Sequence, residues 1–135
     1  MTNVTSRMHQ WQSALVQPFD YTDFASAALI AAIAPKLPMG AMVLSTKVVV
    51  TTQFNGGASS TLSVGISGST TKYANAVDID AATGVVAGAT ATGIPLASEE
   101  TLVLTPSANA IASTAGAGYI VIEYVVAGKG DMVYP

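Results

Sequence analysis

The stretch "LPMGAMVLSTKVVVTTQF", residues 37–54, decides the fold. Neighbouring side chains of a β-strand point to opposite faces of the sheet, so the two sets of alternate residues can be read separately. Val and Thr dominate the stretch, as they do in half-buried strands. It therefore predicts one long strand, which ends at the turn residues Asn55-Gly56-Gly57 because these accept positive φ at low cost. The even-numbered set is predicted to point inward: Met42, Leu44, Thr46, Val48, Val50, Thr52 and Phe54.

Shorter alternations recur along the rest of the chain and are separated by Gly, Asn, Pro and Ser. Residues 60–67, 101–106 and 118–128 each predict one strand. Residues 72–79 predict one or two short strands or a single turn, and residues 81–98 predict one strand and a long loop. The segment between residues 107 and 118 predicts a loop. The inward side chains of these strands are expected to form the core together with those of the long strand: Val48, Val50, Leu62, Val64, Leu102, Leu104, Ile120, Ile122 and Tyr124.

The stretch "YTDFASAALIAAIAP", residues 21–35, is compatible with two structures. Asp20 and Thr22 could cap a helix, and the Ala-rich composition before Pro35 favours one. Residues 28–33 also alternate, as a strand buried on both faces would. Its position before a β-rich region leads us to expect a turn over 20–26 and a strand over 27–34.

The order of these elements predicts an all-β fold. Long helices do not alternate with strands, so a parallel α/β sheet is not expected. Seven or eight short strands favour a single antiparallel β-sandwich, which we expect to be jelly-roll-like. The Cys and Trp signature of an immunoglobulin domain is absent. The chain is expected to divide into an extended N-terminal arm (1–18), a sandwich domain (19–127) and a C-terminal tail (128–135).

Charge is scarce in this protein. Only 10% of its 135 residues are charged, against about 25% in an average soluble domain. A surface with so few charges is poorly protected against association, which suggests that much of it is buried in an assembly. The net charge of −3 and five scattered basic residues argue against nucleic-acid binding. No apolar run is long enough for a membrane span, and no secretory signal pattern is seen, so synthesis in the cytoplasm is expected.

The residues that could carry chemistry do not form a catalytic set. The sole histidine, His9, lies near the terminus, and the lack of cysteine excludes disulfides and thiolate metal sites. Asp78 and Asp80 lack the further ligands of a calcium loop, so we expect neither to bind a structural cation. Glu99 and Glu100 are adjacent and point apart on an extended chain, which does not suit a glycosidase pair. We therefore expect no enzyme activity, no cofactor and no metal.

The N-terminal arm is the segment most suited to assembly. It has no steady period, yet it carries Met8, Trp11, Leu15 and Val16, a set unusual for a disordered polar tail. Trp is also enriched among interface hot spots. These four residues are the predicted interface, with a short extended piece around residues 12–16. The alternative is that Trp11 lies across one end of its own sandwich.

Several motifs taken together resemble one family. Leu37-Pro38-Met39-Gly40 enters the long strand, Thr61-Leu62-Ser63-Val64-Gly65 and Tyr73 follow, and a Gly-rich turn leads to Glu123-Tyr124-Val125. In this order, over residues 20–127, the chain resembles small structural proteins of tailed bacteriophage virions.

The resemblance implies a capsid decoration (cement) protein, which stabilises the phage head by protein–protein contacts and needs no active site. It implies a homotrimer that binds the major capsid protein on the outer capsid surface of the virion, after synthesis in the host cytoplasm. A tail or fibre component is the alternative within the class. A carbohydrate-binding host-recognition module, with Trp11 or Tyr73 stacked on a sugar, is the alternative from another class.

Overall fold

The computed structural model describes residues 13–25, 35–80, 83–87 and 95–126, which are mostly β-strand. Nine strands and two short helices follow one another along this part of the chain. In order, they are β1 (Ser13–Asp20), the 3-10 helix η1 (Tyr21–Ala25), β2 (Lys36–Leu37), β3 (Ala41–Thr52), β4 (Thr61–Ile66), β5 (Ser69–Asp78), β6 (Gly84–Ala87), β7 (Glu100–Thr101), β8 (Val103–Pro106), the α-helix α2 (Ala108–Ile111) and β9 (Ala117–Val126).

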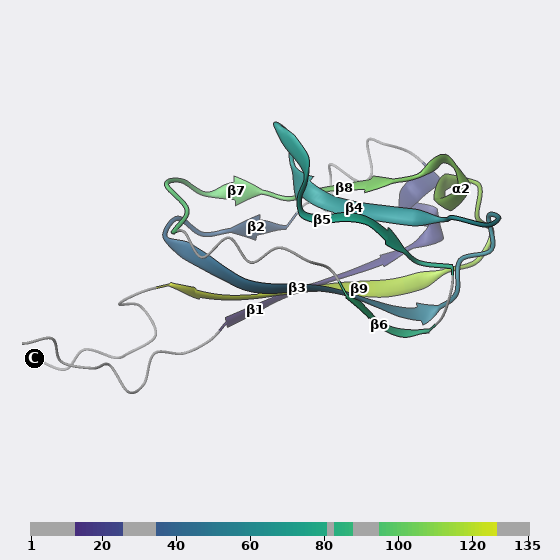
Figure 1. Ribbon diagram of the computed structural model, residues 1–135, viewed down its shortest axis with the longest axis horizontal. Helices are drawn as coiled ribbons and strands as arrows, with labels where there is room; N and C mark the ends of the chain where they lie inside the picture. Colours follow the sequence, from purple (N-terminus) through teal and green to yellow (C-terminus); the bar gives the residue numbers. More distant parts are fainter. Residues whose placement is uncertain (1–12, 26–34, 81–82, 88–94, 127–135) are drawn as a thin grey trace, which may run out of the picture.

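The strands form three antiparallel sheets. The largest has the order β1-β9-β3-β6, a second has the order β5-β4-β8, and the third pairs β2 with β7. In Figure 1 the four-stranded sheet makes one layer, and the two smaller sheets together make a second layer that faces it. The prediction of an antiparallel, mainly β fold is confirmed.

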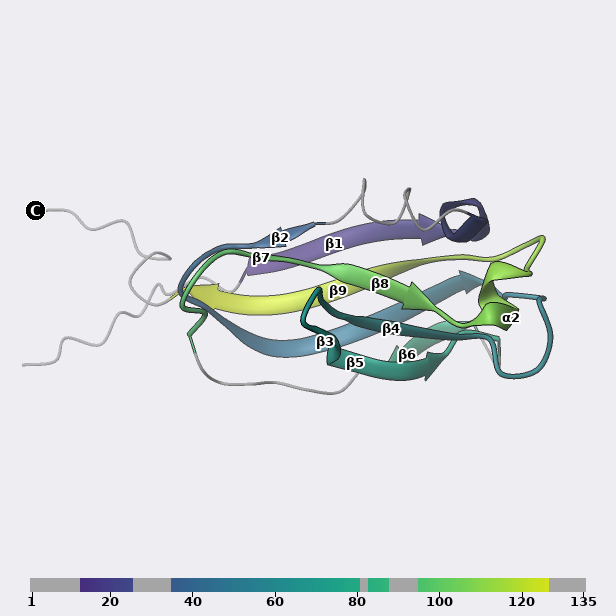
Figure 2. The same cartoon turned by 90° about the horizontal axis from the view of Figure 1, so that it is seen from above.

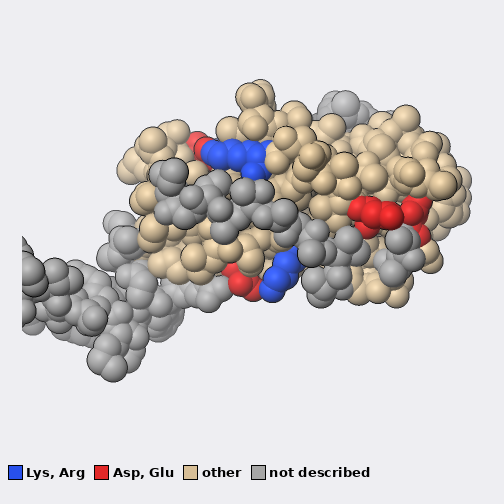
Figure 3. Space-filling view, viewed as in Figure 1, with Lys and Arg blue, Asp and Glu red and all other residues tan. Residues whose placement is uncertain are grey.

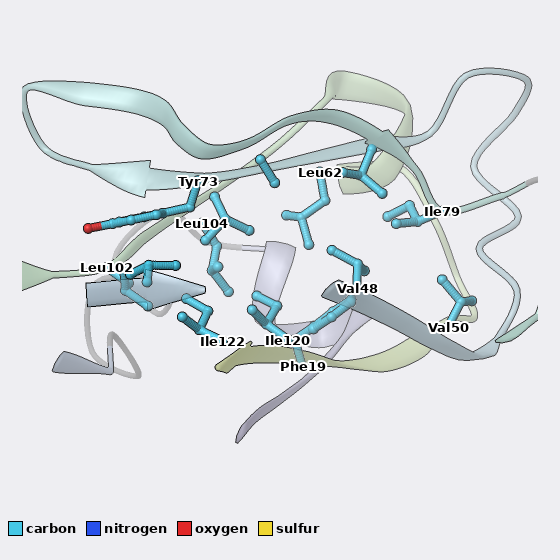
Figure 4. Packing of buried hydrophobic residues seen from close by; sticks show 14 of the residues in the cluster. Phe19, Val48, Val50, Leu62, Tyr73, Ile79, Leu102, Leu104, Ile120 and Ile122 are labelled. Carbon is cyan, nitrogen blue, oxygen red and sulfur yellow. The ribbon is translucent and has the colours of Figure 1, made fainter. Parts of the chain in front are cut away.

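Apolar side chains from both layers meet in one core. Figure 4 shows Val48, Ile120 and Ile122 of the large sheet pointing toward Leu62 and Leu104 of the three-stranded sheet. Eight of the nine predicted core residues are buried, and Tyr124 packs against the core while half-buried. The core is therefore built by the alternation that the sequence shows. Its eight confirmed members are Val48, Val50, Leu62, Val64, Leu102, Leu104, Ile120 and Ile122.

The long strand changes face partway along, which corrects the prediction for Met42 and Leu44. Val43 pairs with Tyr124 and Ser45 with Glu123, so Leu44 is an extra residue at a β-bulge. A bulge shifts the alternation by one residue, and every side chain before it moves to the other face. Ala41 and Val43 are consequently buried, whereas Leu44 is 44% exposed. Thr52 is also exposed, after a second irregularity between Val50 and Thr52.

Other segments also differ from the prediction. Residues 69–78 form one strand, β5, which makes a hairpin with β4. The segment expected to be a loop contains α2, whose N-cap is Ser107: its side chain accepts a hydrogen bond from the backbone N–H of Ala110. The expected turn over 20–26 corresponds to η1. The expected strand over 27–34 lies outside the described residues.

The predicted arm overlaps the large sheet. Residues 13–20 form β1, an edge strand of that sheet, and pair with β9 from Ser13–Tyr124 to Asp20–Ala117. Residues 13–18 are therefore part of the sheet, although the arm was predicted over 1–18. The reason is that β9 supplies a partner strand from about a hundred residues away, which the irregular local pattern does not reveal.

Replacing Val50 by alanine is expected to lower the free energy of unfolding by about 1–3 kcal/mol, because it removes two methyl groups from a packed interior. Val50 is 1% exposed, whereas the side chain of Val49 is half-buried on the opposite face. Val49→Ala is the matched control and should cost less. Urea denaturation of both variants measures the difference, and equal losses would contradict the assigned face of β3.

Candidate interaction surface

The large sheet has a second face, opposite the core, which we call the outer face. The cross-strand pairs place three residues side by side in each row: Pro18, Tyr119 and Val49 in one, and Val16, Val121 and Lys47 in the next. Ala14, Glu123 and Ser45 make the third row. Val16 is 55% exposed and Tyr119 is 42% exposed, so large apolar side chains of this face are in contact with solvent.

The charges of the outer face pair with each other. Lys47 Nζ lies 3.6 Å from Glu123 Oε1, and the Ser45 hydroxyl donates to Glu123 Oε2 over 3.1 Å. The nine residues thus carry one positive and one negative charge. Figure 3 shows how few charged side chains the described residues present on one face of the molecule. An apolar patch with internally paired charges is suited to contact with a protein rather than with a polyanion.

A hollow of about 410 Å³ lies at the end of the outer face near η1. Pro18 and Tyr119 of the outer face line it, together with Thr51 of β3. Asp20 and Asp23 contribute the two carboxyl groups. An exposed apolar face that ends in a hollow offers a partner both a flat contact and a socket.

The two acids of the hollow hold η1 in place. Asp20 Oδ1 accepts from the backbone N–H of Thr22 at 2.8 Å, and the Asp20 N–H donates to Asp23 Oδ2 at 2.8 Å. This reciprocal pattern satisfies backbone donors at a helix start in the way of a capping box. The hydrogen bond from the Thr22 side chain, helped by backbone N–H groups, lowers the pKa of Asp20. The predicted capping role of Asp20 is therefore present, but on a single 3-10 turn.

The four predicted interface residues are not all described. Met8 and Trp11 lie outside the described residues. Leu15 is on the inward side of β1 and packs against the core, whereas Val16 belongs to the outer face. The sequence interpretation missed Pro18 and Tyr119 as surface candidates. The alternation of β9 did assign Tyr119 to the second face, but only the sheet arrangement shows that this side chain is exposed.

A polar cluster ties β5 to β7 on the other layer. Lys72 Nζ and the hydroxyl of the buried Tyr73 both donate to Glu100, one to each carboxylate oxygen. Lys72 Nζ also lies 5.3 Å from the centroid of the Tyr73 ring. Burial is the main cause that raises the pKa of Tyr73. The hydrogen bond to Glu100 and the negative charge of Glu100 raise it further. Burial acts to raise the pKa of Glu100 too, but the bonds from Lys72 and Tyr73 outweigh it, so this pKa is lowered.

Replacing Glu100 by glutamine is expected to reduce stability at pH 7 by about 1–3 kcal/mol, because two charge-assisted hydrogen bonds are weakened. A carboxyl whose pKa is lowered by folding stabilises the native state above its ordinary value of 4.5, and this contribution is lost as pH falls below it. The difference between the wild type and Glu100→Gln should therefore shrink as the solution is acidified.

Chemical denaturation at a series of pH values measures this difference. Glu99→Gln is the control, because Glu99 makes only an exposed ion pair with Lys36 at 3.4 Å and should matter little. The role of the ionised group would be contradicted if the difference in free energy of unfolding between the wild type and Glu100→Gln stayed constant down to about pH 3, well below the ordinary carboxyl pKa.

The other residues considered for metal binding, catalysis or sugar stacking were Asp78, Asp80, His9 and Tyr73. Asp80 Oδ2 accepts from the backbone N–H of Ser60, and Asp78 Oδ1 accepts from that of Asp80, which orders the chain after β5. Within the described residues, no group of three or more His, Cys, Asp or Glu side chains is placed to hold a metal ion. His9 lies outside these residues. Tyr73 is buried and therefore has no free ring face for a sugar. No helix of the described segments has the length and hydropathy to cross a bilayer.

Comparison with known proteins gives one structural likeness. No protein-family model matches the chain, and no curated protein matches its sequence. Among solved structures, a chain of the "Cyanophage Pam1 capsid asymmetric unit" is similar, with a TM-score of 0.67 and 19% sequence identity. The likeness covers 93% of this chain and 92% of that chain. At this identity the likeness shows a shared fold over nearly the whole length.

Proposed function

We propose that this chain is a virion structural protein, a decoration (cement) protein that stabilises a phage head by protein–protein contacts. The observation that carries the proposal is the fold shared with a chain of a cyanophage capsid over nearly the full length of both. The proposed protein has no enzyme activity and no cofactor. It is made in the host cytoplasm and bound to the major capsid protein on the outer capsid surface.

Two features of the chain support this role. Only 10% of its residues are charged, and the outer face presents Val16 and Tyr119 to solvent. A decoration protein is dissolved when free and buries such surface when bound. Many copies bound side by side add avidity, so each contact can be weak. In this proposal the two layers form a jelly-roll-like sandwich, and the protein acts as a homotrimer.

Two other functions are distinguished by experiment. A tail or fibre component would share the fold class but be present in few copies. A carbohydrate-binding host-recognition module would need exposed aromatic side chains for stacking, and the burial of Tyr73 removes one of the two that the sequence suggested.

Co-sedimentation with empty capsids tests the proposal. The capsids are those of the phage that encodes the chain, prepared without this protein, and capsids of an unrelated phage are the control. The proposal expects saturable binding to the cognate capsids alone. Binding to neither, together with retention on a glycan array, would contradict it in favour of the carbohydrate-binding module.

A further inference from the structure

We propose that the hollow beside η1 is a socket for Trp11 of a second copy of this chain, so that the N-terminal segments 1–12 exchange between copies. This inference concerns the free protein and does not depend on binding to a capsid. It rests on the size and lining of the hollow, on where the segment joins the sheet, and on the area of the outer face.

The hollow suits a bulky, partly polar side chain. Its volume of about 410 Å³ is within the range of small ligand pockets, roughly 300–1,000 Å³. Tyr119 and Pro18 supply apolar walls, and the carboxylate oxygens that do not take part in the η1 bonds, Asp20 Oδ2 and Asp23 Oδ1, supply acceptors. An indole has a large apolar body and one N–H donor that needs an acceptor when buried. The hollow therefore has room for an indole and an acceptor for its N–H.

The position of the hollow excludes Trp11 of the same copy. Segment 1–12 joins β1 at Ser13, and the hollow lies at the other end of β1, level with Phe19. Figure 2 shows η1 at that far end of β1. Pro18, a wall of the hollow, is five residues of strand from Ser13, a span of about 17 Å, whereas Trp11 is two residues from Ser13 and can lie at most about 7 Å from it. The remaining gap of about 10 Å is longer than a tryptophan side chain.

The sequence of the segment favours reaching outward. Residues 4–17 contain no Gly, Pro, Asn or Asp, and Ser6 and Ser13 are their only residues of the main turn-forming types, so a tight turn back over the same sheet is disfavoured. Arg7 is the one Lys, Arg, Asp or Glu residue in segment 1–12, and it lies four residues before Trp11. Its positive charge complements the two acids at the hollow of a neighbour.

The outer face alone is too small for a stable contact between copies. Three strands about 4.8 Å apart, over rows from Ala14 to Pro18, give a patch on the order of 300 Å². A stable interface buries about 800 Å² on each partner. An inserted segment adds the missing area and one anchoring aromatic side chain. Because the segment of one copy enters the socket of the next, the contact is heterologous and can close into a ring such as a trimer.

Trp11 is the sole tryptophan, so its fluorescence reports its environment directly. On raising the protein concentration, we expect the emission to shift to shorter wavelength and quenching by iodide to decrease, together with formation of an oligomer in analytical ultracentrifugation. Trp11→Ala should weaken the association at least about tenfold, as expected for a hot-spot residue. Met39→Ala is the control, because Met39 is 67% exposed and lies before the start of β3, at the end opposite Thr51.

Mixing two variants separates exchange from contacts within one copy. Tyr119→Ala keeps Trp11 but damages the socket, and Trp11→Ala keeps the socket but has no tryptophan. The emission of Tyr119→Ala alone should resemble that of exposed tryptophan and should shift to shorter wavelength when Trp11→Ala is added. Circular dichroism checks that both variants remain folded. Emission that does not change with concentration or on mixing would overturn the proposal, as would a buried Trp11 in Tyr119→Ala alone.

Discussion

Replacing Phe24 by alanine is expected to lower the free energy of unfolding by about 3–5 kcal/mol, the usual range for removing a buried phenylalanine. Phe24 is 1% exposed and is one of three phenylalanine rings that stack on one another. Its ring centroid is 5.7 Å from that of Phe19 and 5.5 Å from that of Phe54. These rings join η1 to the ends of β1 and β3, so the alanine variant leaves a cavity where three elements meet.

Thermal unfolding measures this loss. For a chain of this length, the expected decrease corresponds to a melting temperature lower by about 10–20 °C. Phe24→Leu retains much of the volume and should lose less, whereas Tyr21→Ala, at a neighbouring residue that is 37% exposed, should have a small effect. A Phe24→Ala variant as stable as Tyr21→Ala would show that the three rings do not form a packed cluster.

Replacing Gly56 by alanine is expected to destabilise the protein by about 3 kcal/mol, the upper part of the range for overpacking. A Cβ at this position would lie 1.7 Å from the backbone oxygen of Asn109 and 2.7 Å from the hydroxyl of Ser113. Neither the loop nor α2 can move aside easily, because Asn55 Oδ1 accepts from the N–H groups of Thr114 and Ala115. The new methyl group must therefore break contacts that hold α2 against the β3–β4 loop.

Gly68 provides the matched control for this experiment. It lies in the β4–β5 turn, and nothing approaches within 4 Å of an added Cβ. Gly68→Ala should therefore leave the denaturation midpoint almost unchanged. If Gly56→Ala and Gly68→Ala unfold at the same denaturant concentration, α2 does not pack against the β3–β4 loop as closely as described.

Gly56 also shows where local interpretation of the sequence falls short. The turn Asn55-Gly56-Gly57 was predicted from tolerance of positive φ, and Gly57 does have φ +119°. Gly56 is required for a different reason: the backbone of Asn109 passes so close to it that a Cβ does not fit. That contact joins residues more than fifty positions apart, and no local pattern reveals it.

The core was predictable because a period of two is a local property of a strand. Val48, Val50, Ile120 and Ile122 are buried as their alternation indicates. The bulge at Leu44 was not predictable, because it is defined by the pairing of β3 with β9. Only part of β1 was predicted, as a short extended piece around residues 12–16, for the same reason: its irregular sequence is ordered by β9.

The candidate surface was predictable only in part. Alternation in β9 placed Tyr119, Val121 and Glu123 on one face, but it could not tell whether another layer covers that face. Tyr73 illustrates the converse case. It was a candidate for sugar stacking, and the fold buries it against Glu100, which comes from a strand that follows it by 27 residues.

The most direct test of the proposed role is the amount of this protein in purified virions. Quantitative mass spectrometry, with labelled peptides of this chain and of the major capsid protein as standards, gives the ratio of the two. A decoration protein should be present at a ratio comparable to that of the major capsid protein. A few copies per virion would contradict the central claim and identify a tail or fibre component, and absence from the virion would contradict both.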